Sequence, residues 1–400
     1  MLIGLIVMYA IGPQRANVMN NAYGTNFYTD TYFAVKQVTS LVLAMGAFVL
    51  AAKIPFGWFT KHAGKFLAIG LALCAALFLF GNVLKINAIA TNTLGAYRWF
   101  NLGALGSFQP AEFLKFGLLL YLAVFLSKRA SQGLLNNTEK TITPVVVISL
   151  ISLLFVVILQ NDLGTGITVG SIVATILMVS GIDRKTGVKL LVAVLILGIV
   201  AIAAAPHRRD RIITFFSGSG KSSANATSND YQIHNAMIAL GSGGAFGLGV
   251  GNSIQASGYL PEAINDSVFA IIGEMFGFVG VSVILVIFAA LLMRLLRIAD
   301  RAPDMTARLV VAGVFGWLAA HVILNVASMI GVVPLTGITL PLLSFGGTSM
   351  LFVTGAMGLA FQLSKYTTHS VNVNQGGSAH ENIGGRRGIG RTRVAGRRAI

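Results

Sequence analysis

The sequence predicts an all-α, polytopic integral membrane protein with about ten transmembrane helices and one large extracytoplasmic loop. Composition supports this fold class, since hydrophobic residues make up 55% of the 400 residues and charged residues only 10%. Soluble domains carry roughly 25% charged residues. The apolar residues also form long runs instead of alternating with polar ones. Because irregular backbone cannot face lipid, we expect these runs to be helices.

The first apolar run is short, because about twelve helical residues reach only about 18 Å across a hydrocarbon core of about 30 Å. We therefore expect either that the helix continues through Pro13 or that its natural start is missing. The candidate spans are residues 1–12, 36–52, 66–84, 108–127, 143–160, 164–181, 187–205, 266–293, 309–331 and 340–364.

The chain is expected to divide into a transmembrane domain, residues 1–366 with its large outer loop at 206–265, and a basic tail, residues 367–400. The tail is rich in glycine and arginine, which predicts disorder. It either anchors the topology as a solvated segment or contacts anionic lipid head groups or a cytoplasmic partner.

The distribution of basic residues predicts the orientation of the chain. With the N-terminus in the cytoplasm, most of the 29 lysines and arginines fall in inner loops and in the tail, so we expect both termini inside. The net charge of +16 is spread between apolar runs and forms no single groove, so nucleic acid is not an expected partner. The histidines and the single Cys74 show no spacing that predicts a zinc site.

Polar residues gather around the start of the fourth apolar run, where Arg98, Gln109, Glu112 and Lys115 lie. Glu112 and Lys115 are three residues apart and share one face of a helix. Pro110 fits the first turn of that helix, where its missing N–H costs nothing. The two charges can form an internal ion pair. Alternatively, Arg98 and Lys115 form a cationic wall for the phosphate oxygens of an anionic substrate, with Gln109 and Glu112 beside them.

Three further segments each allow two interpretations. Asp162 follows a tight hairpin and either caps the next helix or helps to bind a metal ion or a sugar. Arg208 and Arg211 lie on the outer face against the orientation rule, and either belong to a solvated loop or bind pyrophosphate. Ser344 lies in the segment 341–349, whose small residues either permit close packing or line a cavity beneath the outer site.

Asp266 is the strongest candidate for a reactive group. It lies where an apolar run begins, with Glu262 before it and Glu274 after it. Ionisable groups at the centre of a span cost on the order of 2.5–3.5 kcal/mol each, which makes them functional candidates. Asp266 can cap the following helix. At the interface it can also stay ionised with a raised pKa, as a general base for a hydroxyl requires. Glu274 is expected about 12 Å further along the helix, neutral or paired.

Six segments of the chain carry a joint pattern: RWFNLG, FQPAEFLK, QNDLGTG, YQIHNAMIALGSGGAFGLGVGNSIQ, YLPEAINDSVFAIIGE and VVPLTGITLPLLSFGGTSML. Together they resemble the SEDS family of shape, elongation, division and sporulation proteins, over nearly the whole chain after the first span. The aspartate of the family pattern is present as Asp266, whereas Asn161, Asn265, Ser267 and Met275 differ from the residues usual at those positions. The motifs are more similar to those of the division members than to those of the elongation members.

The resemblance implies a peptidoglycan glycosyltransferase of the bacterial cell (inner) membrane, with its active site on the outer face. Its substrate would be lipid II, and its partners a class B penicillin-binding transpeptidase and other divisome membrane proteins. Asp266 would be the catalytic base. Arg98, Lys115, Arg208 or Arg211 would stabilise the departing pyrophosphate, with a divalent cation, Mg²⁺ or Mn²⁺, as a further candidate. Three alternatives remain, a glycosyltransferase of the elongation type, a lipid II flippase and a non-catalytic scaffold.

Overall fold

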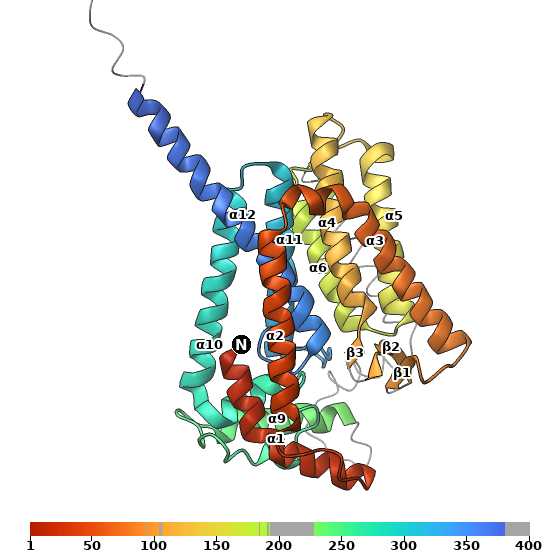
Figure 1. Ribbon diagram of the computed structural model, residues 1–400, viewed down its shortest axis with the longest axis vertical. Helices are drawn as coiled ribbons and strands as arrows, with labels where there is room; N and C mark the ends of the chain where they lie inside the picture. The colour runs from red at the N-terminus through yellow and green to blue at the C-terminus, as the bar shows by residue number, and fades with distance from the viewer. Residues whose placement is uncertain (94, 104–105, 184, 190–191, 193–227, 381–400) are drawn as a thin grey trace, which may run out of the picture.

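The computed structural model describes residues 1–93, 95–103, 106–183, 185–189, 192 and 228–380. Most of its helices run along the long axis as a bundle (Figure 1). They are α1 (Leu2–Tyr23), α2 (Tyr32–Lys53), α3 (Phe56–Phe78) with its extension η1 (Leu79–Val83), α4 (Pro110–Ser131), η3 (Thr138–Ile142) leading into α5 (Thr143–Leu153) and η4 (Leu154–Leu159), α6 (Leu163–Val179), α9 (Ser228–Ser242), η5 (Gln255–Ser257), α10 (Val268–Asp300), α11 (Met305–Met329) and α12 (Gly347–His380).

Among the described residues, seven helices are long and apolar enough to cross a membrane, and α6 is a shorter apolar helix. The polytopic helical fold is therefore confirmed. Helix α1 continues through Pro13, which was one of the two expectations for the first apolar run. Most of the predicted span at 187–205, the first part of the predicted outer loop and residues 381–400 lie outside the described residues.

The ends of two predicted spans lie elsewhere in the structure. Helix α3 begins at Phe56, well before residue 66. Helix α12 begins at Gly347 instead of 340 and continues to His380, so the segment predicted as a tail from 367 begins inside this helix. Residues 340–346 are not helical, and they contact the candidate site described below.

Close packing between helices depends on small residues at the contacts. A Cβ added to Gly117 of α4 would lie 2.8 Å from the carbon and oxygen of the Phe66 carbonyl in α3. A Cβ on Gly316 of α11 would lie 2.2 Å from Thr175 Oγ1 in α6. In lipid, where no hydrophobic effect drives helices together, such close backbone approach supplies the packing energy. The core that results contains α3, α4, α6, α11 and α12, and a second core contains α1, α9, α11 and the first turns of α10.

A small antiparallel sheet closes the lower end of the bundle in Figure 1. Its strands are β1 (Ala90–Thr93), β2 (Ala96–Asn101) and β3 (Ser107–Phe108), in the order β1-β2-β3. The sequence predicted only helices and loops, and this sheet is a local correction to that prediction. It leads directly into α4, and Gln109 becomes the N-cap residue of that helix.

Candidate active site

Asp266 lies in the turn that immediately precedes α10. The N-cap residue of α10 is Ser267, so Asp266 does not cap this helix. Only 8% of the surface of Asp266 is exposed. From α9, Gln232 Nε2 donates to Asp266 Oδ1 at 3.3 Å and to Ser267 Oγ at 2.9 Å. The carboxylate therefore has a buried position that is held from a second helix.

The backbone of the same turn is held by α11 and by the segment before α12. Asn325 Nδ2 donates to the carbonyl of Asp266 at 2.7 Å and to the carbonyl of Ile338 at 2.7 Å. The N–H of Phe345 donates to the carbonyl of Ile264 at 2.8 Å. Three segments that are far apart in the sequence therefore meet at Asp266.

The surroundings of Asp266 disfavour its charge. Burial, followed by repulsion from Glu262, raises the pKa of Asp266 to about 7, although hydrogen bonds from Gln232 and from backbone N–H groups act in the opposite direction. Glu262 itself is exposed, with a left-handed backbone (φ 50°), and its carboxylate accepts from Asn265 Nδ2. A carboxylate with a pKa near neutral pH suits general base catalysis.

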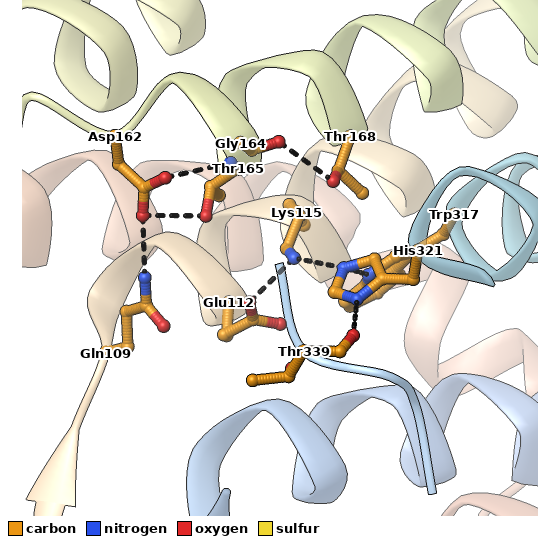
Figure 2. Close-up of polar contacts among 10 residues, drawn as sticks. All are labelled: Gln109, Glu112, Lys115, Asp162, Gly164, Thr165, Thr168, Trp317, His321 and Thr339. Carbon is orange, nitrogen blue, oxygen red and sulfur yellow. Dashed lines mark hydrogen bonds and ion pairs between the residues drawn. The ribbon is translucent and has the colours of Figure 1, made fainter. Parts of the chain in front are cut away.

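A buried ion pair lies at the start of α4 (Figure 2). Lys115 Nζ lies 2.7 Å from Glu112 Oε1, and the side chain of Lys115 is 0% exposed. On its other side the ammonium contacts His321 Nε2 at 3.2 Å and lies 4.8 Å from the ring centroid of Trp317. The predicted internal ion pair is present. Contact of Lys115 with phosphate stays a prediction.

His321 connects this ion pair to the segment before α12. Its Nδ1 lies 3.2 Å from the carbonyl of Thr339, and Trp317 Nε1 donates to its Nε2 at 3.3 Å. Because a carbonyl can only accept, Nδ1 carries the proton and Nε2 accepts from Lys115. His321 and Asn325 are neighbours on one face of α11 and bind adjacent carbonyls, Thr339 and Ile338. The ion pair and Asp266 are thereby attached to the same segment.

The hairpin before α6 uses Asp162 as an N-cap. Asp162 Oδ1 accepts from the N–H of Thr165 at 2.9 Å, and Oδ2 accepts from Thr165 Oγ1 at 2.8 Å and from Gln109 Nε2 at 3.1 Å. Arg98, on β2, donates to the carbonyls of Gln160 at 3.3 Å and Asn161 at 2.8 Å. The capping role expected for Asp162 is therefore observed, and Arg98 attaches the sheet to the hairpin.

The described residues do not fit a metal ion held by protein side chains alone. No group of three histidine, cysteine, aspartate or glutamate residues in the described part of the chain could hold one. Both oxygens of Asp162 are already engaged by hydrogen bonds from Thr165 and Gln109. The metal role of Asp162 stays a prediction, and no step of the reaction below uses a metal.

The other predicted site residues lie in different places. Ser344 is buried, and its Oγ accepts from the N–H of Leu340 at 2.8 Å. It therefore stabilises the turn that precedes Phe345, the residue that donates to the carbonyl of Ile264. Arg208 and Arg211 lie outside the described residues. Sequence reasoning did not select Gln232, whose only signal was its place in the long glycine-containing motif.

The family model described as "Cell cycle protein", which covers FtsW, RodA and SpoVE, matches residues 1–369. The chain belongs to the FtsW/RodA/SpoVE family. The resemblance found in the motifs is therefore confirmed, and within this family Asp266, Glu112 and Lys115 lie in segments that carried the resemblance.

Two similar members of the FtsW/RodA/SpoVE family come from Bacillus subtilis strain 168. One is a "Probable peptidoglycan glycosyltransferase FtsW", 31% identical over 379 residues, which cover 92% of this chain and 89% of the relative. The other is "Stage V sporulation protein E", 31% identical over 374 residues, which cover 92% and 94%. These similarities do not favour an elongation protein such as RodA over FtsW.

Solved structures show the same fold. A chain from a peptidoglycan synthase complex aligns with a TM-score of 0.68 at 24% identity, covering 91% of this chain and 97% of that chain. The rod shape determining protein RodA of Thermus thermophilus aligns with a TM-score of 0.59 at 23% identity, covering 90% and 94%. This chain is therefore a multi-pass membrane protein of the FtsW/RodA/SpoVE fold.

Proposed function

We propose that this chain is a peptidoglycan glycosyltransferase that polymerises lipid II into glycan strands during septal wall synthesis. The observation that carries this proposal is the buried carboxylate of Asp266, with a pKa of about 7, in a chain whose similar relatives are named peptidoglycan glycosyltransferases. Its membrane would be the bacterial cell membrane, with both termini in the cytoplasm and Asp266 on the outer side.

In the proposed reaction, ionised Asp266 takes the proton from the 4-hydroxyl of the acceptor N-acetylglucosamine. The oxygen then attacks the anomeric carbon of the donor N-acetylmuramic acid and inverts it to a β-1,4 bond. The bond from that carbon to the undecaprenyl pyrophosphate breaks, and the pyrophosphate leaves with the electron pair. Because only 8% of Asp266 is exposed, the acceptor must displace a neighbour such as Gln232, whose hydrogen bond to the carboxylate is 3.3 Å long.

Charge on the departing pyrophosphate has to be stabilised by cations at the outer end. Arg98 is only half-buried and both of its bonds go to carbonyl oxygens, so it can add a phosphate contact without breaking an ion pair. The charge of Lys115 is already neutralised by Glu112, so Lys115 would stabilise the pyrophosphate only through the electrostatic potential of the ion pair. Arg208, Arg211, Gln109 and Ser344 complete the proposed substrate-binding set with Glu262.

The proposed domain organisation has residues 1–366 as the glycosyltransferase domain and 367–400 as a basic tail. A class B penicillin-binding transpeptidase and other divisome proteins are the proposed partners. The solved neighbour from a peptidoglycan synthase complex supports the first of these. No nucleic acid partner is proposed.

Polymerisation of labelled lipid II by the purified chain with its transpeptidase partner tests the proposal. Wild type should form glycan polymer, and Asp266→Asn should lower the rate by at least about 10²-fold, as expected for loss of a general base. Partner binding and elution volume serve as controls for folding. Near-normal polymerisation by Asp266→Asn would show that Asp266 is not the general base. A wild-type chain that moves lipid II across vesicles without polymerising it would favour a flippase, and one that does neither would favour a scaffold.

A further inference from the structure

Glu274 has no part in the reaction above, although it lies in the same motif as Asp266. Only 1% of its surface is exposed. Its carboxylate accepts hydrogen bonds from Ser253 Oγ, from the N–H of Ile254 at 2.9 Å and from the N–H of Gln255 at 3.2 Å. All of these donors come from one turn. Since a buried charge is stable only when its oxygens are bonded, the turn and the carboxylate depend on each other.

The turn 253–255 is the beginning of the loop that ends at Asp266. The carbonyl of Gln255 accepts from the N–H of Leu260 at 2.9 Å. At the other end, Ser267 Oγ donates to the carbonyl of Pro261 at 3.0 Å, immediately before α10 begins. Both ends of the loop 255–267 are therefore attached to the first part of α10, one end through Glu274 and the other through the chain itself.

The first part of α10 is separated from the rest of the helix by a break at Gly277 (φ 66°, ψ −168°). Backbone groups freed by a break at a membrane must find other partners. The glycine-rich run 243–249 supplies them on both sides of the break. The hydrogen bonds are Leu248 N to Glu274 O at 2.9 Å, Gly249 N to Met275 O at 3.1 Å, Phe278 N to Gly244 O at 2.8 Å and Val279 N to Ala245 O at 3.1 Å.

We propose that Glu274 is a positioning residue for the reaction at Asp266, because it fixes the turn 253–255 and thereby holds the loop 255–267 against the first part of α10. This inference rests on the proposed function. Without the anchor, the start of the loop loses its hydrogen bonds to α10, and Asp266 is held less firmly beside Gln232. A misplacement of about 1 Å at a reacting group can cost about 10²-fold in rate.

Glu274→Gln tests this role with little change in size. The amide keeps one acceptor oxygen for the N–H groups of Ile254 and Gln255, but it loses the negative charge, and Ser253 Oγ has to accept from the new NH₂ group instead of donating. Because charge-assisted hydrogen bonds are about twice as strong as neutral ones, the turn is held more weakly. In lipid II polymerisation we expect kcat to fall about 10- to 100-fold, with KM within about two-fold. The midpoint of the acid side of the pH–rate profile should also move to lower pH, since a looser loop lets water reach Asp266. A purely structural defect lowers the amount of active protein and leaves this midpoint unchanged.

Ser253→Ala identifies the route of the effect. It should lower kcat less than Glu274→Gln does, and the double variant should be no slower than Glu274→Gln alone, because both changes release the same turn. Fully additive losses would show that Glu274 acts elsewhere and would overturn the proposal. Glu139→Gln, an exposed glutamate on η3, is the matched control and should retain wild-type kcat.

Amide hydrogen exchange separates this inference from the proposed function, because it needs no activity. In Glu274→Gln, exchange at Ile254, Gln255 and Leu260 should become at least about 10-fold faster. If exchange is faster in Glu274→Gln but the wild type does not polymerise lipid II, the anchoring role of Glu274 is supported and the proposed reaction is refuted. An active wild type whose Glu274→Gln variant has unchanged exchange or unchanged kcat would overturn the positioning role.

Discussion

At the scale of single residues, the protonation of Asp266 decides when the proposed base can act. Burial raises its pKa to about 7, with a further contribution from Glu262, so a large fraction is protonated at neutral pH. Only the ionised carboxylate can accept a proton from the sugar hydroxyl. The pH range in which the site works is therefore set by how dry and how negative its surroundings are.

This predicts the pH dependence of polymerisation. A base with a raised pKa is lost as pH falls, so kcat should rise from pH 5.5 through a midpoint near 7 and level off above pH 8. Glu262→Gln removes the like charge beside Asp266 and should move the midpoint to lower pH. The measurement is initial polymerisation rate against pH for both proteins. A midpoint that stays fixed in Glu262→Gln would show that the charge of Glu262 does not reach Asp266.

Sequence reasoning selected Asp266, whose catalytic role stays a prediction, but it did not select the partners that hold Asp266. An acid at the start of an apolar run is visible locally, and so is a pair at helical spacing such as Glu112 and Lys115. Gln232 is 34 residues from Asp266 in the chain, and no local pattern connects them. His321 of α11 contacts Lys115 of α4, and both His321 and Asn325 also bind carbonyls of a non-helical segment, which no spacing in the sequence indicates.

At the scale of elements, the buried pair at the start of α4 tests how α4 and α11 are held together. Breaking a buried ion pair by removing one partner costs about 3–5 kcal/mol, because it leaves an uncompensated charge. Glu112→Gln and Lys115→Met should each lower the melting temperature strongly, and the double variant Glu112→Gln/Lys115→Met should be more stable than either single variant. Thermal unfolding in detergent checks this. Losses that simply add would mean that the two charges do not stabilise each other.

The break in α10 gives a second prediction at this scale. A Cβ on Gly247 would lie 2.2 Å from the carbonyl oxygen of Met275, inside the backbone pairing, and φ is 85°. Gly251 has φ 89° and nothing within 4 Å, so Gly251→Ala carries the backbone strain alone. We expect Gly251→Ala to cost about 1 kcal/mol and Gly247→Ala clearly more, measured as the difference in melting temperature. Equal effects of the two variants would show that the pairing across the break contributes no stability.

Apolar runs predicted most of the elements, and the misplaced boundaries have a common cause. Residues 340–346 belong to an apolar run, yet Leu342 has a left-handed backbone (φ 68°), and the N–H of Phe345 holds the turn at Ile264. A single glycine such as Gly277 inside an apolar run predicts a continuous helix. Its break depends on a loop some thirty residues earlier in the chain, which supplies the missing hydrogen bonds.

At the scale of the whole molecule, charge and fold agree about the two ends of the bundle. The start of α10, which Asp266 precedes, the sheet β1–β3 and the start of α4 lie at the lower end in Figure 1. The ends of α2 and α4, the start of α3 and the turn between α10 and α11 lie at the other end. Those elements carry the basic residues Lys53, Lys61, Lys65, Lys128, Arg129, Arg297, Arg301 and Arg308. From this distribution the positive-inside rule predicts that the end with Asp266 lies outside the cell.

Because Cys74 is the single cysteine and is buried, new cysteines can report this orientation one at a time. Tyr259 is 55% exposed in the loop that leads to Asp266, and Glu139 is exposed on η3, which leads into α5. The start of α5 lies at the opposite end of the bundle in Figure 1. In intact cells a membrane-impermeant maleimide should label Tyr259→Cys and leave both Glu139→Cys and the parent chain unlabelled. After permeabilisation Glu139→Cys should react as well. The reverse pattern would place Asp266 in the cytoplasm, on the side of the membrane where no glycan strand is built, and the proposed polymerase would then be wrong.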